Sequence, residues 1–371
     1  MLHVVAFIAS VVCVYLGMQY YIAWWTLRHF PNLPVAPGTL RILLLLVALS
    51  FPLGMWLLRS HSTPFTRAFA WLSFIWLGAS FLMLSSAVLG DLLETALRWS
   101  RWAGPAHRGA AWGVLLLAAF SVGWSLFDAA RVPRVREVEV RLPRLPRELD
   151  GLRVVQLSDL HLGLSVSLDQ FERILERVKG LSPDLVVFTG DLLDPGFAGE
   201  ERLASQLAGL APRLGVLSVF GNHEHYHGVD ASLASYRRSG LPLLRGEVRV
   251  LPGGLQVAGI DDQMAARLDD EDVGKVLGRL DPAKPSILLS HQPLRFELAA
   301  EKGVGLMLSG HTHRGQLFPF TLLVRAVYKR VYGPYRSGAS TLYVSPGAGN
   351  WGPPMRFLAP AEIVLLRLRA P

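Results

Sequence analysis

The most informative stretch of the chain is LRVVQLSDLH, residues 152–161, in which a short run rich in valine ends in an aspartate and a histidine. Such a run is typical of a buried β-strand. Asp159 and His161 are two positions apart, so in extended backbone both side chains project to one side and can reach one cation. The stretch therefore predicts a strand that delivers metal ligands at its carboxyl end.

Four later stretches repeat this arrangement of an apolar run followed by polar residues. They are LVVFTGD at 185–191, VLSVFGNHE at 216–224, ILLSH at 287–291 and GLMLSGHTH at 305–313. Helical patterns separate the first strands, which indicates a layered α/β fold. Ligands collect at the carboxyl ends of strands in such folds, so we expect the five polar clusters to meet.

Each polar cluster taken alone has an ordinary structural explanation. An aspartate after a strand is often a turn or helix-cap residue, and a buried histidine such as His291 is often a hydrogen-bonded core residue. Five strands that all end in carboxylate, amide or imidazole groups favour a metal site over five coincidences. The only cysteine, Cys13, lies in an apolar stretch far from these clusters, so a thiolate metal site is not expected.

The order Asp-x-His, Gly-Asp, Gly-Asn-His-Glu, His and Gly-His-x-His resembles that of the calcineurin-like metallophosphoesterases, over about residues 150–365. The resemblance implies an αββα sandwich, with two mixed sheets flanked by helices around a dinuclear metal centre. It assigns Asp159, His161 and His313 to the first metal, and Asn222, His291 and His311 to the second, with Asp191 as the bridging and catalytic carboxylate.

The same resemblance makes His223 a catalytic group that protonates the leaving oxygen or steadies the phosphoryl group, while Glu224 orients the loop. Two cations about 3.5 to 4 Å apart lower the pKa of a shared water and clamp phosphoryl oxygens. We therefore expect two divalent ions, Mn, Fe, Mg or Zn, and attack by the metal-activated hydroxide on a phosphate ester.

The closing segment SPGAGNWGPPMR, residues 345–356, resembles the end of one branch of this family that includes membrane-associated bacterial enzymes. Relatives of UDP-diacylglucosamine pyrophosphohydrolases look similar, but the substrate does not carry over. Arg314 departs from this branch, in which glycine commonly follows the second histidine. Its guanidinium suits bidentate bonds to phosphate in a substrate, and a solvated arginine at the rim is the alternative.

The first 130 residues have the composition of a membrane region. They carry seven arginines, no lysine and three acidic residues, whereas residues 131–371 carry thirty basic and twenty-six acidic residues. The net charge of +8 thus divides as +4 and +4, which does not indicate a nucleic-acid partner. Four apolar stretches without internal charges predict about four transmembrane helices, at 2–27, 42–58, 68–89 and 110–127.

The predicted organisation is a transmembrane region at 1–130, a basic proline-rich linker at 131–149 and a metallophosphoesterase domain at 150–371. The chain is expected to be a multi-pass integral protein of the cytoplasmic membrane. Arginines in the short loops favour an external catalytic domain, but six arginines soon after the fourth stretch draw that end toward the cytoplasm. Within the catalytic domain, the apolar and aromatic segment 317–335 predicts a cap or interfacial helix near the bilayer.

The function expected from this pattern is hydrolysis of a phosphodiester or pyrophosphate bond, in a substrate that is lipid-linked or part of the cell envelope. Two alternatives stay open. One is a phosphomonoesterase or nucleotide phosphodiesterase for which the helices are only a tether. The other is a non-catalytic sensor or scaffold that uses the metal centre for binding.

Overall fold

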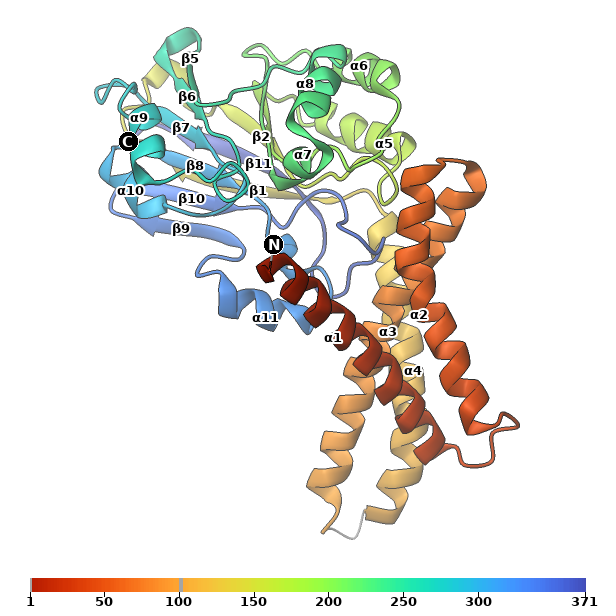
Figure 1. Cartoon of the computed structure of the whole chain (residues 1–371). Coiled ribbons are helices and arrows are strands. Elements are labelled where there is room, and N and C mark those ends of the chain that lie inside the picture. The colour runs from red at the N-terminus through yellow and green to blue at the C-terminus, as the bar shows by residue number, and fades with distance from the viewer. Residues whose placement is uncertain (1, 100–102) are drawn as a thin grey trace. The chain divides into compact units, whose positions relative to one another are not determined.

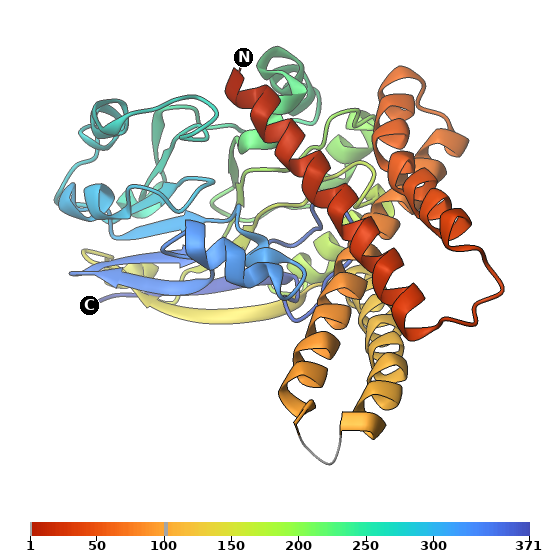
Figure 2. The ribbon, with the colours of Figure 1, turned by 60° about the horizontal axis from the view of Figure 1, so that its bottom comes forward.

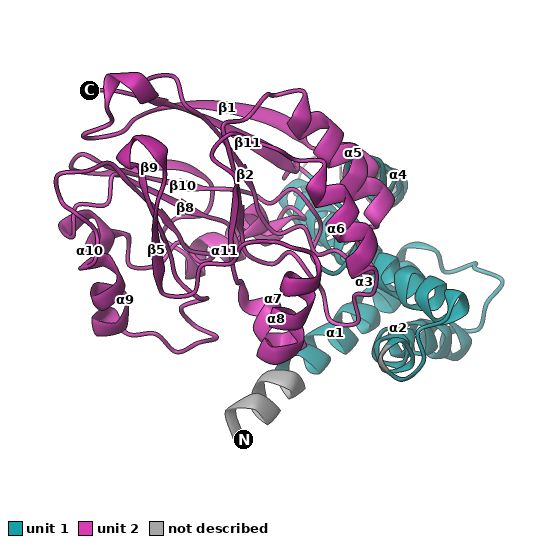
Figure 3. Ribbon diagram, turned by 90° about the horizontal axis from the view of Figure 1, so that it is seen from above, with its two compact units in different colours: residues 1–128, 352–357 teal, residues 129–351, 358–371 magenta. Residues whose placement is uncertain are grey.

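The computed structural model describes residues 2–99 and 103–371, with side chains described for all of these except 2–9, 59 and 103–108 (Figure 1). The chain divides into two compact units, coloured separately in Figure 3. The helical unit comprises residues 1–128 and 352–357, and the sheet unit comprises residues 129–351 and 358–371.

Four long helices make up most of the helical unit: α1 (Leu2–His29), α2 (Pro37–Ser60), α3 (Pro64–Leu97) and α4 (Ala103–Ala130). Three segments within α2, α3 and α4 are long and apolar enough to cross a bilayer, namely 37–58, 64–97 and 109–130. The expected first span at 2–27 coincides with α1, but the side chains of its first eight residues lie outside the described part of the chain. The described helices thus provide three candidate spans.

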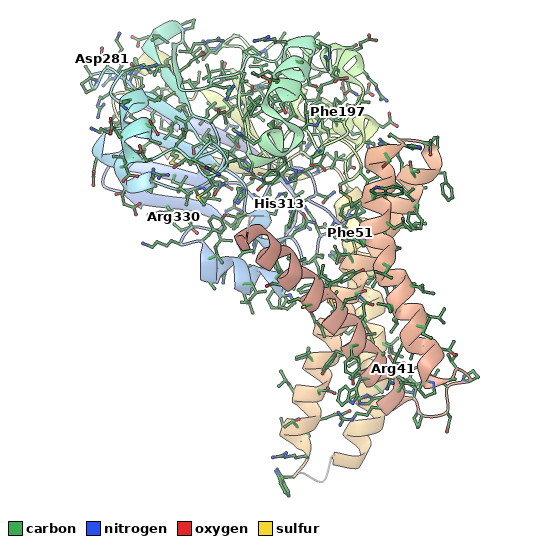
Figure 4. All side chains as sticks on the ribbon, viewed as in Figure 1. Arg41, Phe51, Phe197, Asp281, His313 and Arg330 are labelled. Carbon is green, nitrogen blue, oxygen red and sulfur yellow. The ribbon has the colours of Figure 1, made fainter. Side chains whose placement is uncertain are left out.

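Small residues fill many of the contacts between these helices, and many large apolar residues are exposed. Along α3 the buried positions include Ser73, Gly78, Ala87 and Gly90, whereas Leu72 is 59% exposed. This arrangement is typical of helices in lipid, where association depends on close backbone approach and large apolar groups face acyl chains. Aromatic rings add edge-on contacts: Phe51 of α2, labelled in Figure 4, lies 5.2 Å from the Phe74 ring of α3.

Helix α3 continues past the expected end of the third span at residue 89 and carries two acidic residues that pair with α1. The Tyr21 hydroxyl donates to Asp91 Oδ2 at 2.5 Å, and His29 Nε2 lies 3.1 Å from Glu94 Oε1. Arg28 also pairs with Glu94, at 3.5 Å. Polar partners on α1 therefore allow a helix with two carboxylates to extend to Leu97.

The end of the closing segment packs among the helices. A Cβ atom on Gly78 of α3 would lie 2.6 Å from the Met355 sulfur, so glycine is needed for this approach. The backbone N–H of Arg356 donates to the Ser125 carbonyl of α4 at 2.9 Å, and the Arg356 side chain is fully buried. Residues 352–357 are accordingly an integral part of the helical unit.

The sheet unit contains two mixed β-sheets. Five strands form the first sheet in the order β1-β11-β2-β3-β4, and six form the second in the order β5-β6-β7-β8-β10-β9. The strands of the first sheet are β1 (Arg134–Arg141), β2 (Arg153–Leu157), β3 (Leu185–Thr189), β4 (Val216–Val219) and β11 (Glu362–Arg369). Those of the second are β5 (Glu247–Val250), β6 (Gln256–Gly259), β7 (Ser286–Leu289), β8 (Leu306–Ser309), β9 (Gly333–Ser337) and β10 (Ser340–Val344).

Helices cover the outer faces of both sheets and confirm the expected αββα sandwich. The first sheet packs against α5 (Leu168–Lys179), α6 (Glu200–Ala208) and α8 (Val229–Arg238), and the second against α9 (Asp270–Leu277) and α10 (Phe296–Glu301). In β3, Leu185 and Val187 join the core between the sheets, whereas Val186 and Phe188 pack toward the helices. Because both faces are buried, the strand reads as an unbroken apolar run.

Part of the expected linker at 131–149 is the strand β1. It pairs in parallel with β11 from Arg134↔Glu362 to Arg141↔Arg369, and Figure 2 shows this yellow strand beside the blue end of the chain. Val140 is its one buried residue, and its glutamates pair with Arg367 and Arg369. An edge strand that is mostly exposed can be rich in charge, which explains why its sequence looks like a linker.

Replacement of Gly90 by alanine is expected to destabilise the helical unit. The new methyl group would lie 2.5 Å from Val114 Cγ2 of α4 and force the two helices apart, at a cost of about 1 to 3 kcal/mol. Thermal denaturation of the detergent-purified chain measures this loss. The control is Gly113→Ala, whose Cβ meets nothing within 4 Å; equal midpoints for the two variants would contradict the expected helix contact.

Candidate metal centre

All seven predicted metal ligands lie just beyond the carboxyl ends of five strands. Strands β2, β3 and β4 run parallel in the first sheet, and β7 and β8 run parallel in the second, so each group of strands ends at a common edge. The ligands that follow these strands are Asp159 and His161 after β2, Asp191 after β3, Asn222 after β4, His291 after β7, and His311 and His313 after β8. The structure brings all of them together in one cluster.

One half of the cluster contains Asp159, His161 and His313, all of them buried. The Nε2 atoms of His161 and His313 are 3.1 Å apart, and His313 Nε2 lies 3.4 Å from Asp159 Oδ1. Two imidazoles and one carboxylate thus present ligand atoms to a common point. These are the three groups that the sequence assigns to the first metal.

The other half of the cluster centres on the Nε2 atom of His291. This atom lies 3.1 Å from Asn222 Oδ1, 3.1 Å from Asp191 Oδ2 and 3.2 Å from His311 Nδ1. Asp191 Oδ2 is also 3.7 Å from Nε2 of His161 in the first half. The Asp191 carboxylate therefore faces both halves, as a bridging ligand must.

In the neutral imidazoles of His291 and His161, the hydrogen bonds around the cluster leave the inner nitrogen without a proton. His291 Nδ1 faces the Thr189 carbonyl at 2.9 Å, so this nitrogen carries the hydrogen and Nε2 presents a lone pair. His161 Nδ1 likewise faces the Asp194 carboxylate at 2.8 Å. Lone pairs of nitrogen and oxygen then converge with no donor between them, and cations relieve the repulsion. The donor set fits two divalent ions.

The electrostatics of His291 show that the two carboxylates beside it favour positive charge. Burial opposes the charged form of His291, yet the nearby carboxylates of Asp191 and Asp159 raise its pKa well above the ordinary value. Burial and the charge on His291 lower the pKa of His311 to about 4. The raised pKa of His291 reflects the negative charge of Asp191 and Asp159, which bound metal ions would neutralise in place of a proton.

The backbone at the ligands adopts a conformation that L-residues rarely take. Five of the seven have positive φ, namely Asp159, His161, Asp191, His311 and His313, with values from 47° to 69°. Strain of this kind persists only where the surrounding structure imposes it, and it is common at functional sites. Close packing adds a second restriction, because a Cβ on Gly310 would lie 2.1 Å from Asp159 Oδ2.

Two carboxylates that are not ligands hold the cluster in place. Glu224 accepts hydrogen bonds from the backbone N–H groups of Asp191, Leu192, Leu193 and Gly221, at 2.7 to 3.0 Å, which is the loop-orienting position expected for it. Asp194 accepts from Nδ1 of both His161 and His223, at 2.8 Å each. Burial opposes ionisation of Asp194, but the two histidines lower its pKa to about 2.

His223 lies at the edge of the cluster, with its ring 4.5 Å from that of His161. Its Nδ1 is held by Asp194, so Nε2 is the nitrogen that can exchange a proton. Burial of the ring opposes the charged form, but Asp191 and Asp194 raise the pKa of His223 to about 9. Bound cations would act in the opposite direction.

Asp194 and Tyr328 are absent from the ligands and catalytic residues predicted from the sequence. Asp194 stands three residues after Asp191 in the loop, a spacing that could have singled it out. Tyr328 lies seventeen residues from His311, and its hydroxyl oxygen is 2.7 Å from His311 Nε2. The predicted substrate residue Arg314 lies over the ring of Tyr332, 4.5 Å from its centroid.

The chain is similar to proteins of one family over much of its length. The family model described as Calcineurin-like phosphoesterase matches residues 152–315. An uncharacterized metallophosphoesterase of Helicobacter pylori is 37% identical over 257 residues, which cover 68% of this chain and 68% of that protein. A transmembrane protein with metallophosphoesterase domain from Bos taurus is 32% identical over 348 residues, covering 84% of this chain and 78% of that one. Among solved structures, a dimetal phosphatase from Danio rerio has a TM-score of 0.37 at 14% identity, over 54% of this chain and 88% of that chain.

Replacement of Asp194 by asparagine is expected to weaken metal binding although Asp194 is not a ligand. The neutral amide oxygen is a weaker acceptor than the carboxylate for the Nδ1–H groups of His161 and His223, and loss of such a partner typically costs 10- to 100-fold in metal affinity. Metal content after dialysis against graded chelator measures the change. Asp184→Asn is the matched control, since Asp184 binds Arg153 and Arg213 outside the cluster. Equal retention by the two variants would contradict the assigned role.

Proposed function

The chain belongs to the calcineurin-like phosphoesterase family, and on that premise we propose that it is a membrane-anchored, two-metal phosphohydrolase. The bond it cleaves is a phosphodiester or pyrophosphate, and the substrate is a lipid or cell-envelope compound. The observation that supports this proposal best is the convergence of ligand atoms at two adjacent points with Asp191 facing both. A dinuclear centre of this kind suits in-line displacement at phosphorus.

The protein groups divide the chemical work between them. Asp159, His161 and His313 would hold one divalent ion, and Asn222, His291 and His311 the other, with Asp191 shared. Such a pair of ions, when bound, lowers the pKa of a water molecule so that hydroxide is available for attack, and neutralises charge on the phosphoryl oxygens. His223 carries the proton that the leaving oxygen needs, because Asp194 fixes its Nδ1 and leaves Nε2 for transfer.

The helical unit is the reason for proposing a substrate that lies in or at the membrane. It contains three candidate spans, and the similarity to the bovine transmembrane protein covers 84% of the chain, well beyond residues 152–315. We place the sheet unit on the external side, because the first and third connections between the helices carry more arginines than the second. The next experiment distinguishes this proposal from two alternatives, a phosphomonoesterase and a purely binding role.

Detergent-purified protein is expected to hydrolyse bis(p-nitrophenyl) phosphate only with added Mn or a similar ion, and faster than p-nitrophenyl phosphate. Asp191→Asn removes the bridging charge and should lower the rate by at least about 100-fold, through loss of a charge-stabilising group. The matched control is Asp281→Asn at an exposed carboxylate, labelled in Figure 4. Preference for the monoester would favour a phosphomonoesterase, and bound metal without hydrolysis of either ester or of lipid pyrophosphates would favour a binding role.

His223→Asn is expected to lower hydrolysis by about 100- to 10,000-fold for esters with a poor leaving group, because the proton donor is lost. The p-nitrophenolate group leaves without a proton, so the loss should be much smaller for the chromogenic ester. Steady-state rates on an alkyl and a p-nitrophenyl phosphodiester give the comparison, with His227→Asn on the same helix, α7 (Asn222–His227), as control. An equal loss on both esters would exclude His223 as the general acid.

A further inference from the structure

Helix α11 (Phe320–Val327) of the sheet unit is almost entirely apolar and almost entirely exposed. Its sequence is FTLLVRAV, and Thr321 is its one buried residue. Leu322 is 55% exposed, Leu323 is 60% exposed and Val327 is 76% exposed, and Phe318 and Phe320 at its start are also exposed. A helix in a water-soluble domain normally buries its apolar side chains against the core, so this surface requires a partner.

The stretch of sequence that contains α11 carries charge of one sign. Residues 302–361 contain seven basic residues and no acidic residue, a run of sixty positions that includes the whole helix. Arg325 and Lys329 are exposed, and Arg330, labelled in Figure 4, pairs with Glu297. An exposed apolar helix with lysine and arginine and no carboxylate is typical of a segment that lies in the interface of an anionic bilayer.

Both ends of α11 are attached to the loop that carries the metal ligands His311 and His313. At its start, the Thr321 hydroxyl donates to the Arg314 carbonyl at 2.8 Å. At its end, Tyr328 accepts from His311 Nε2 at 2.7 Å, with His311 Nδ1 left to face the metal position. The helix and the metal centre are thus one continuous part of the sheet unit.

We infer that α11 docks on the surface of an anionic bilayer, with Leu322, Leu323 and Val327 immersed at the boundary of headgroups and acyl chains. A bilayer is the occupant favoured over a second copy or another protein for two reasons. The same chain carries candidate membrane spans, and the exposed Arg325 and Lys329, in a stretch without acidic residues, match anionic headgroups. Because α11 contacts the loop that carries His311 and His313, the docking would bring the metal centre close to phosphates at the membrane surface. It goes beyond the proposed hydrolysis and can be tested without it.

The test is the depth of a nitroxide label on α11 in the full chain, reconstituted in nanodiscs of phosphatidylcholine with phosphatidylglycerol. Cys13 is the only cysteine, so Cys13→Ser frees the chain for a single label at Leu323→Cys. The matched control is Val250→Cys on β5, since Val250 is 58% exposed. Power saturation then compares collisions with oxygen, which enters the bilayer, and with a nickel chelate, which stays in water.

The expected result is an oxygen-to-nickel collision ratio at position 323 that is severalfold higher than at position 250 and falls when phosphatidylglycerol is left out. A ratio at 323 equal to that at 250 would show that α11 stays in water and overturn the proposal. Shielding of 323 from both reagents would mean that protein covers the helix, which overturns it as well. Both labelled variants must keep the thermal midpoint of the parent chain, and neither readout depends on hydrolysis.

Discussion

Ligand atoms that face one another with no proton between them are the constraint on which the sheet unit depends. Nitrogen and oxygen lone pairs from Asp191, His161 and His291 meet within 3.1 to 3.7 Å in a buried place, where repulsion is little screened. Such an arrangement is unstable by itself, and it persists because the surrounding backbone and carboxylates hold each group in position. The need to bring five strand ends to one place also explains why two sheets are stacked, since a ligand cluster from both sheets forms only where their carboxyl ends coincide.

The rigidity of this arrangement comes from ordinary apolar packing. Alternate side chains of β3 and β8, such as Val187 and Leu306, interlock between the sheets, and the intervening residues pack under the helices. Dense packing of this kind fixes the strand ends and allows left-handed backbone at ligands that would otherwise relax. Glu224 then gathers four backbone N–H groups of the ligand loops, so its burial is compensated by hydrogen bonds.

The resemblance to the calcineurin-like metallophosphoesterases implies the sandwich, and the local pattern predicts the clustered side chains because every ligand follows an apolar strand by only two to four residues. A local sequence pattern is enough to predict a ligand when the residue directly follows a strand, because the strand then determines where the side chain lies. Asp194 and Tyr328 were not predicted because their roles depend on which side chains the fold brings to them. The strand β1 has the sequence of a linker because its hydrogen-bond partner, β11, lies over two hundred residues away and its own sequence is mostly charged. The extension of α3 to Leu97 similarly depends on Tyr21 and His29 of α1.

The path of the chain between the two units determines whether the sheet unit can be produced without the helices. The backbone passes from one unit to the other after Asp128, returns after Trp351 and leaves again after Phe357. No single cut can therefore liberate an intact catalytic fragment. A polypeptide that starts near residue 131 would retain Met355 and the wholly enclosed Arg356 but lack the helices around them. The side chains of Met355 and Arg356 would then be exposed to solvent. A fragment that starts near residue 131 should therefore have residues 352–357 replaced by a short polar linker.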